Sequence, residues 1–599
     1  MLVAYLLFAS GYGYWLDSGE FVAAAMDFGI SHPPGHPLAS IVLGSAQLLP
    51  MGALSFRVAL VCGALGAIAA VALFFATEAC LSLGELVSAH LRTPVCLAAT
   101  WWIAGSYAWA FQSVRPEVYS LQAALSFIAI ERLLRASINV QGDPANGDRR
   151  PLFHAALALG LAFANHHFLA LLLLPPSLLL LVGIVRSVGW RPLLTSCAFL
   201  TAGLLTYVFL PIRAAARPAL SLGEPNSPAR FLWVISAEAF QKSLATERPG
   251  SFTEGLAHVL FRILEDLHVF ALLLALLGVY LMCRIGATRK YGLFWLALLL
   301  LSVFGRAALG FVEGNPDAAG YLLPAYGAIG VFCALTVGLV LSALDDAVEQ
   351  SPRLVPGLAF GLALLGLLQF PLSAAKTSLA SFKDTDVFDD GLRRELPPRS
   401  IVLAYNPHTV FRFWGGETEE RNRPDVTVIP MPFLSYPKLV EQLVSKDPEI
   451  KPLLRDAMLE GGLNPSELQS LASLRPVFVE MDARVPTALF ESLAPEQLYH
   501  RVIGPDGDTG DGKAYEELWE DVYSRLGEPV DPQTQGQLLW RHYADALHFA
   551  ATGETAAAQN ATARALAIDP QSEALQELGE ALAQSSAGER LDIEPFRLH

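Results

Sequence analysis

The chain falls into an apolar region and a polar region. Long apolar runs dominate up to about Leu372, and charged residues are spread throughout the chain after Lys383. Because a membrane span needs about 20 apolar residues, the first region predicts a mainly α, polytopic helical bundle with about eleven spans. The predicted spans are 1–15, 56–80, 93–112, 117–131, 152–164, 168–185, 191–211, 267–283, 291–309, 320–342 and 354–374.

The polar region predicts a soluble part made of two pieces. Residues 401–404, 425–429 and 476–479 have the pattern of short strands around helical stretches, typical of a small α/β domain. From about Gln535 the apolar positions follow helical spacing, and residues 553–570 resemble the second helix and exit turn of a tetratricopeptide repeat (TPR). We therefore expect domains at 1–375, 376–530 and 531–599.

Basic residues predict the orientation, because Lys and Arg concentrate in cytoplasmic loops. With the N-terminus inside, loop 16–55 is outside and carries no Lys or Arg, whereas the outer loop 212–266 carries several. An odd number of spans then places the polar tail outside. The same topology gathers these polar residues on the outer face: Asp17, Glu20, His32, His36, Arg115, Glu117, His166, His167, Arg213, Glu224, Asn315 and Asp317. Either they share a cavity or they reflect only the usual polarity of loops.

Composition narrows the class of protein. The chain of 599 residues is 53% hydrophobic and only 16% charged, with a mean hydropathy of +0.41, too apolar for a soluble protein of this length. The net charge of −16 argues against a nucleic-acid partner. All six cysteines lie in or beside apolar segments without metal-binding spacing. No basic residue precedes the first apolar run, which predicts a first span rather than a signal peptide.

The most informative polar interruption has two parts, Leu16-Asp17-Ser18-Gly19-Glu20-Phe21 and Ser31-His32-Pro33-Pro34-Gly35-His36-Pro37-Leu38. With weaker matches at 115–119, 210–215, 223–225, 317–324 and 423–426, this pattern resembles a bacterial domain-of-unknown-function membrane family. That family is related to protein O-mannosyltransferase-like proteins of the GT-C glycosyltransferase superfamily. Two departures stand out: His36 replaces a frequent Tyr, and Asn406-Pro407-His408 replaces an Asp-rich turn.

The resemblance implies many transmembrane helices and a long first outer loop that carries an essential acid. It implies a sugar donor linked to polyprenyl phosphate, with mannose as a candidate sugar. It also implies transfer to a protein hydroxyl or a glycan on the outer face. The expected location is a bacterial inner membrane, with the active face and the tail in the periplasm. The expected partners are membrane lipid, the lipid-linked sugar and the acceptor.

Asp17 is the first candidate for the base that takes the acceptor's proton, since it follows the first apolar run and should lie at the membrane surface. The alternative is an N-cap, because Asp17-Ser18-Gly19-Glu20 also approximates a capping box. Glu20 is then either the box partner or a second acid.

His32 and His36 flank Pro33-Pro34-Gly35, a stiff loop that disfavours a regular helix. A metal bound at helical spacing is therefore not expected, and no cofactor is assigned. The two imidazoles are expected either to hydrogen-bond phosphate or sugar, or to stabilise the loop.

Arg115 is expected either to bind the lipid phosphate or to pair with Glu117. His166 and His167 interrupt an apolar run, where polar groups are costly without a function. The plainer reading is that one of them satisfies a backbone carbonyl, and the break itself is either a turn or an interruption within one helix.

Arg213, at the outer end of a span, is the preferred phosphate partner, with snorkelling to lipid head groups as the alternative. Asp317 is expected either to contact substrate or to be a solvated loop acid.

Two other classes of protein compete with a glycosyltransferase. A transporter or flippase of lipid-linked sugars would have internal repeats and charges at the bilayer midplane, and neither is evident. A non-catalytic membrane scaffold would bind partners through its outer domain and would tolerate loss of Asp17.

Overall fold

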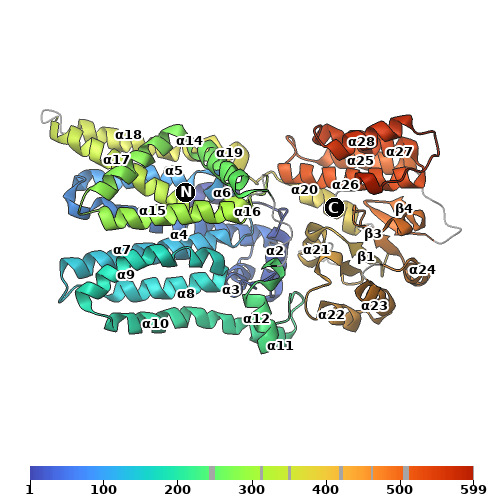
Figure 1. Ribbon diagram of the computed structural model, residues 1–599, viewed down its shortest axis with the longest axis horizontal. Helices are drawn as coiled ribbons and strands as arrows, with labels where there is room; N and C mark the ends of the chain where they lie inside the picture. The colour runs from blue at the N-terminus through green and yellow to red at the C-terminus, as the bar shows by residue number, and fades with distance from the viewer. Residues whose placement is uncertain are drawn as a thin grey trace. The chain divides into compact units, whose positions relative to one another are not determined.

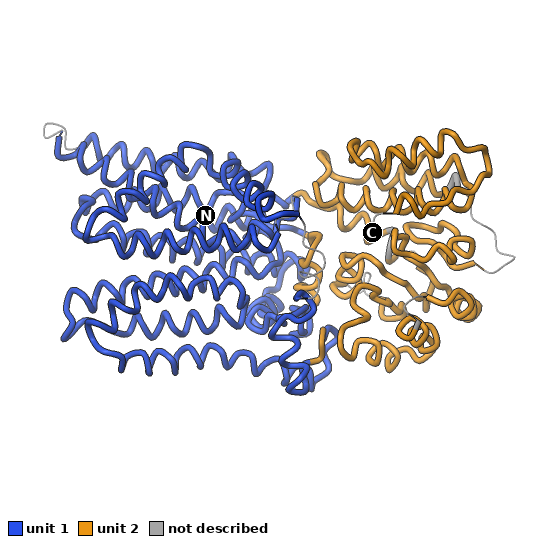
Figure 2. The backbone as a smooth tube through the Cα atoms, in the orientation of Figure 1, with its two compact units in different colours: residues 1–11, 24–221, 225–380 blue, residues 12–23, 222–224, 381–599 orange. Residues whose placement is uncertain are grey.

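The computed structural model describes residues 1–241, 250–310, 314–347, 353–394, 396–416, 423–460, 463–503 and 512–597. Contacts divide the chain into two compact units, coloured in Figure 2. Unit 1 comprises residues 1–11, 24–221 and 225–380, and unit 2 comprises residues 12–23, 222–224 and 381–599. The short segment 12–23, which contains Asp17 and Glu20, therefore groups with the C-terminal half of the chain.

Unit 1 is built of helices (Figure 1). In chain order they are α1 (Leu2–Phe8), α3 (Pro37–Gly44), α4 (Leu54–Leu81), α5 (Ala89–Ala104), α6 (Tyr107–Ser113), α7 (Tyr119–Gly142), α8 (Arg150–Leu171), α9 (Leu174–Val188), α10 (Arg191–Leu204), α11 (Phe209–Ala216), α12 (Pro228–Ile235), α14 (Phe252–Arg284), α15 (Arg289–Ala308), α16 (Asp317–Gly320), α17 (Leu323–Ala347), α18 (Leu354–Leu367) and α19 (Gln369–Thr377). Helix α2 (Ser18–Asp27) begins in unit 2 and ends in unit 1.

Seven helical stretches of the described residues are long and apolar enough to cross a membrane. They are α4, α8, α10 with α11, α14, α15, α17, and α18 with α19. Shorter apolar stretches lie at Pro37–Leu48 and Leu174–Val188. The chain is thus a polytopic, mainly α membrane protein, as its apolar runs predict.

Several predicted spans differ in detail from the helices observed. The helix in the predicted span 1–15 covers only Leu2–Phe8. The predicted span 93–112 is divided between α5 and α6, where the Asp266 carboxylate accepts hydrogen bonds from the backbone N–H groups of Tyr107 at 2.6 Å and Ala108 at 2.9 Å. A carboxylate at this position stabilises the start of α6, because the first N–H groups of a helix lack partners within the helix.

Unit 2 contains a five-stranded sheet with the order β2-β1-β3-β5-β4. Its strands are β1 (Ile401–Ala404), β2 (Thr427–Pro430), β3 (Val477–Val479), β4 (Leu493–Glu496) and β5 (Tyr499–Val502). Strand β1 pairs in parallel with β2 and β3, whereas β5 pairs antiparallel with β3 and β4. All four residues of β1 are fully buried, as expected for an apolar strand that has a neighbouring strand on each side.

Helices complete unit 2. They are α20 (Asp384–Asp389), α21 (Pro407–Trp414), α22 (Leu439–Lys446), α23 (Lys451–Glu460), α24 (Pro465–Leu474), α25 (Gly512–Arg525), α26 (Pro532–Thr552), α27 (Thr555–Ile568) and α28 (Glu573–Gln584). Helices α26, α27 and α28 pack in succession. Their similarity to a TPR and the three-domain division of the sequence stay predictions.

One face of α26 carries buried polar residues at helical spacing, Arg541, Asp545 and His548. His548 Nε2 lies 3.2 Å from the carbonyl oxygen of Phe490, so this nitrogen carries a proton and donates. Burial lowers the pKa of His548 to about 4, against an ordinary value of 6.5. The imidazole is therefore neutral in the folded protein at neutral pH.

This lowered pKa predicts acid sensitivity. Because the folded pKa is below the unfolded one, the contribution of His548 to stability is present above pH 6.5 and is lost as the pH falls toward 4. At pH 5 the loss is about 2 kcal/mol. Burial raises the pKa of Asp545 to about 6, which gives the opposite slope, so wild type and His548→Gln must be compared. Thermal unfolding at pH 7 and pH 5 should show a smaller acid shift in the variant, and equal shifts would contradict the assignment.

Candidate active site

The acidic segment of unit 2 is held at the start of helix α2. Asp17 directly precedes α2, and its carbonyl accepts the Phe21 N–H at 3.0 Å. Ser18 and Glu20 are fully buried, whereas Asp17 is half-buried. Gly19 is required by close packing, because a Cβ there would lie 3.1 Å from the backbone carbon of Phe411 in α21.

Tyr436 is a neighbour of the two acids that the sequence did not indicate. Burial, followed by the negative charges of Glu20 and Asp17, raises the pKa of Tyr436. The phenol therefore keeps its proton at neutral pH beside the two carboxylates. Oxygens of Asp17 and Glu20 lie within 4.8 Å of one another, near enough to contact one divalent cation.

In unit 1, a buried cluster forms around Arg115, whose side chain has no exposed surface. Its guanidinium donates to Glu117 Oε1 at 3.3 Å and to Gln112 Oε1 at 3.0 Å, and it forms a short ion pair with Asp317 in α16. Gln112 in turn donates to the Pro316 carbonyl at 2.7 Å. Two carboxylates thus already pair with Arg115, whether its role is to bind the lipid phosphate or only to pair with Glu117.

Three histidines of unit 1 gather around the loop 32–36. The ring of His36 lies 5.1 Å from that of His32 and 5.6 Å from that of His166, between ring centres. His166 also approaches Tyr119 at 5.9 Å and Tyr321 at 5.3 Å. His166 is the break in α8, with φ −149° and ψ 90°, so two helical segments meet at a kink in the Asn165-His166-His167 segment.

The protonation state of His36 follows from its surroundings. Its Nδ1 lies 2.6 Å from the Asn165 carbonyl oxygen, which can only accept, so Nδ1 carries the proton. Burial, then the neighbouring imidazoles of His32 and His166, lowers the pKa of His36 well below its ordinary value. A neutral ring with Nδ1–H leaves Nε2 as the accepting nitrogen, which suits a hydroxyl group better than a phosphate oxygen.

Asn165 links the histidine cluster to the Arg115 cluster. The Asn165 side chain donates to the Val118 carbonyl at 3.1 Å and to Gln122 Oε1 at 3.0 Å. Asn165 therefore holds the break in α8 against the loop that carries Arg115 and Glu117. Tyr119 and Tyr321, 5.6 Å apart, belong to the same region.

Arg213 lies elsewhere in unit 1, whereas His167 lies beside the histidine cluster. Arg213 donates to the carbonyls of Phe28 at 3.0 Å and Asp27 at 2.5 Å, and pairs with the Asp27 carboxylate at 3.3 Å. His167 is half-buried and its ring contacts Phe168 at 5.1 Å. Their substrate roles stay predictions, as do those of the other candidates.

Several members of these clusters were not among the residues predicted from the sequence. Gln112, Asn165 and Arg306 are polar residues within or beside apolar runs, and that isolation was the available signal. Arg306 lies over the Tyr321 ring, 5.0 Å from its centre, and donates to the Gly310 carbonyl at 2.7 Å. It adds a cation on α15 beside a ring of the histidine cluster.

Comparison with solved structures defines the fold. The chain aligns with ArnT from Cupriavidus metallidurans bound to undecaprenyl phosphate, covering 84% of this chain and 98% of that chain, at a TM-score of 0.52 and 12% identity. The apo state of the same protein gives a TM-score of 0.51, with 84% and 97% covered at 12% identity. The expected fold class, a mainly α polytopic membrane bundle with a second unit that contains a small sheet, is therefore confirmed, and the chain shares the fold of ArnT.

Comparison of sequences confirms the resemblance. Residues 17–187 match the family model described as the protein O-mannosyl-transferase TMEM260 N-terminal domain. Over 241 residues the chain is 30% identical to protein O-mannosyl-transferase TMEM260 of Mus musculus, covering 39% of this chain and 32% of the mouse protein. The chain thus spans about a third of the length of that relative.

Gly35 offers a test of the loop that carries the histidines. Its φ is +85°, and an added Cβ would lie 3.0 Å from Val234 Cγ1 and 3.1 Å from Leu210 Cδ2. Gly35→Ala should therefore destabilise the protein by about 1–2 kcal/mol. Gly361→Ala in α18 meets nothing within 4 Å and serves as the control. Thermal unfolding of both variants measures the difference, and equal midpoints would contradict it.

The Arg115 cluster predicts a large stability effect. Arg115→Gln should cost about 3–5 kcal/mol, because it leaves the buried Glu117 and the partly buried Asp317 without their cation. Unfolding in detergent, followed by tryptophan fluorescence, measures this loss. Arg150→Gln, at an exposed position, is the matched control. A loss no larger than that of the control would show that the two carboxylates are neutralised in another way.

Proposed function

We propose that this protein is a membrane glycosyltransferase that moves a sugar from a polyprenyl-phosphate donor to a hydroxyl acceptor. The main support is that the family match begins at Asp17 and includes the histidine loop and the Arg115–Glu117 pair. Buried charges and imidazoles in an apolar bundle are costly and therefore favour a functional site.

The relatives support the substrate classes. The name of the mouse relative supports mannose as the sugar and a protein as the acceptor. The undecaprenyl phosphate bound to ArnT, whose fold this chain shares, supports a polyprenyl-phosphate carrier. We further propose a bacterial inner membrane, with transfer on the periplasmic face, because loop 16–55 lacks basic residues.

The proposed step is a single displacement at the anomeric carbon. The acceptor hydroxyl oxygen forms a bond to this carbon while the bond to the phosphate oxygen breaks. The hydroxyl proton passes to the Asp17 carboxylate, a role worth about 10²–10⁴-fold in rate. The bonding electrons leave with polyprenyl phosphate, and Glu20 is the next candidate for the base.

The leaving phosphate needs a cation, and unit 1 offers Arg306 as a candidate beside Arg213 and Arg115. Arg115 already pairs with Glu117 and Asp317. Arg306 lies over the Tyr321 ring, beside the histidine cluster. An arginine fork suits phosphate oxygens. We assign to His36 Nε2 the role of accepting a hydrogen bond from a hydroxyl group, either of the sugar or of the molecule that receives it.

The lipid chain needs an apolar groove. Unit 1 contains an apolar crevice of about 260 Å³ lined by α5, α14, α17 and α18, including Trp102, Phe270 and Leu274. Apolar side chains dominate its lining, which suits a hydrocarbon chain. This crevice supports the proposed donor class without specifying the length of its lipid.

Asp17→Asn is expected to abolish transfer, because an amide cannot take the proton from the acceptor. The assay uses purified protein in nanodiscs with labelled polyprenyl-phosphate mannose and a Ser/Thr-containing peptide. Asp148→Asn, in an exposed loop, is the matched control and should retain wild-type activity. Full activity in Asp17→Asn would contradict Asp17 as the base and leave Glu20 as the next candidate. If neither wild type nor the variants transfer the sugar, the proposed donor or acceptor is contradicted.

A further inference from the structure

The segment 12–23 is fixed to unit 2 by hydrogen bonds along its length. The Thr385 hydroxyl donates to the Gly13 carbonyl at 2.7 Å, and the Tyr14 hydroxyl donates to Asp531 Oδ1 at 3.0 Å. Trp15 Nε1 donates to Thr534 Oγ1 at 2.8 Å. The three contacts come from elements far along the chain, in α20 and at the start of α26. They stop one residue short of Leu16.

Leu16, the residue before Asp17, is the strained position of this segment. Its φ is +62°, a left-handed conformation that costs about 1–2 kcal/mol for a residue with a Cβ. Its backbone N–H donates to His408 Nδ1 at 2.8 Å. The His408 ring also meets the Trp15 ring edge-on, at 6.1 Å between centres. A hydrogen bond at this position holds the turn that orients the next residue, Asp17.

His408 is itself held at the first turn of α21. Asn406 is the N-cap residue, and its Oδ1 accepts the His408 N–H at 2.9 Å. Glu480, which follows β3, accepts the backbone N–H groups of Tyr405 at 2.9 Å and Asn406 at 2.8 Å. A cap residue with a satisfied backbone sets the direction in which a helix begins.

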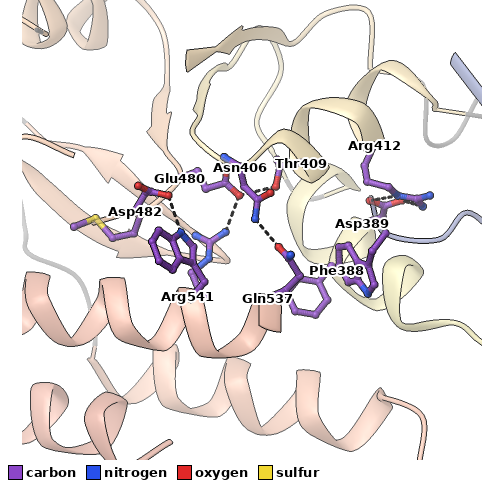
Figure 3. A pocket seen from close by; sticks show the side chains of 12 residues that line it. Phe388, Asp389, Asn406, Thr409, Arg412, Glu480, Asp482, Gln537 and Arg541 are labelled. Carbon is purple, nitrogen blue, oxygen red and sulfur yellow. Dashed lines mark hydrogen bonds and ion pairs between the residues drawn. The ribbon is translucent and has the colours of Figure 1, made fainter. Parts of the chain in front are cut away.

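A buried ion pair between Glu480 and Arg541 stabilises this arrangement. Arg541 of α26 donates to Glu480 Oε1 at 3.2 Å, and the Thr409 hydroxyl donates to the same oxygen at 2.5 Å (Figure 3). Both charged side chains are more than 90% buried. The small cavity beside them, about 20 Å³, is bordered by Trp15 as well as by Asn406 and Arg541. One rigid network thus reaches from α26 to the residue that precedes Asp17.

We propose that His408 is a positioning residue for the transfer reaction, through which unit 2 holds Asp17 in its working orientation. This inference rests on the proposed role of Asp17 as the base. It assigns a purpose to the Asn406-Pro407-His408 turn, which departs from the family pattern. His408 acts on the reaction through the Leu16 amide, and the proposal requires no contact of its own with substrate.

A pair of substitutions separates the hydrogen bond from the bulk of the ring. His408→Asn places an amide oxygen near the position of Nδ1 and can still accept from Leu16, whereas His408→Leu fills the space without an acceptor. We expect kcat to fall about 10–100-fold in His408→Leu, because a small displacement of a catalytic group has this effect. KM for the lipid-linked sugar should stay near the wild-type value. His408→Asn should restore kcat to within about threefold of wild type.

Hydrogen exchange provides a readout that does not depend on activity. The Leu16 amide should exchange about tenfold faster in His408→Leu than in wild type, as expected from loss of one hydrogen bond. His408→Asn should retain the protection. His154→Leu, at an exposed position on α8, controls for the loss of an imidazole elsewhere. Full-length protein in nanodiscs is used throughout.

The outcomes distinguish this inference from the proposed function. If Asp17→Asn is inactive while His408→Leu keeps wild-type kcat, His408 is not a positioning residue and the inference is overturned. Unchanged Leu16 exchange in His408→Leu overturns it as well. If Asp17→Asn keeps full activity, the base assignment fails, whatever His408 does. Equal losses of kcat in His408→Asn and His408→Leu would assign the effect to packing and reject the hydrogen bond.

Discussion

Arg115 is a permanent cation without exposed surface in an apolar bundle, and its neutralisation constrains everything around it. A bare guanidinium in such surroundings would be unstable, so two carboxylates must lie within reach and stay there. Glu117 comes from the same loop, whereas Asp317 comes from a distant part of the chain. The position of α16 relative to α6 therefore depends on charge as well as on apolar packing. Gln112 and Asn165 then fix the neighbouring backbone by their amides.

Unit 2 also contains a buried charge that must be paired, in this case the negative charge of a carboxylate. Glu480 is buried and accepts from two backbone N–H groups, a hydroxyl and Arg541. Burial of the carboxyl group raises the pKa of Glu480, and Arg541 and the hydrogen bonds oppose this rise. Such networks tolerate little displacement, because each unsatisfied buried group costs about 1–3 kcal/mol. Both units thus hold backbone near the candidate residues by paired buried charges.

The sequence was most informative where local pattern decides the structure. Apolar runs predicted α4, α15 and α17 closely, and the short β-branched runs predicted β1 and β3. The division of 93–112 was missed, and Asp266, which accepts the first N–H groups of α6, lies in another helix. The Asp17 and His36 motifs were visible as polar interruptions, whereas Tyr436 was not. The turn that contains His408 stood out, but its contact with Leu16 did not. Nothing local marks a residue whose partner is hundreds of positions away, and such pairs depend on the tertiary fold.

The discontinuous composition of unit 2 has a consequence for the order of assembly. Residues 12–23 leave the ribosome well before most of unit 2, which begins at Ser381. At a synthesis rate of ~5–20 residues per second, the delay is on the order of tens of seconds. During this time the apolar helices between them can enter the bilayer, while the acidic segment still lacks its partners. A truncated product would carry the aspartate but could not orient it, so completion of synthesis would itself act as a check on activity.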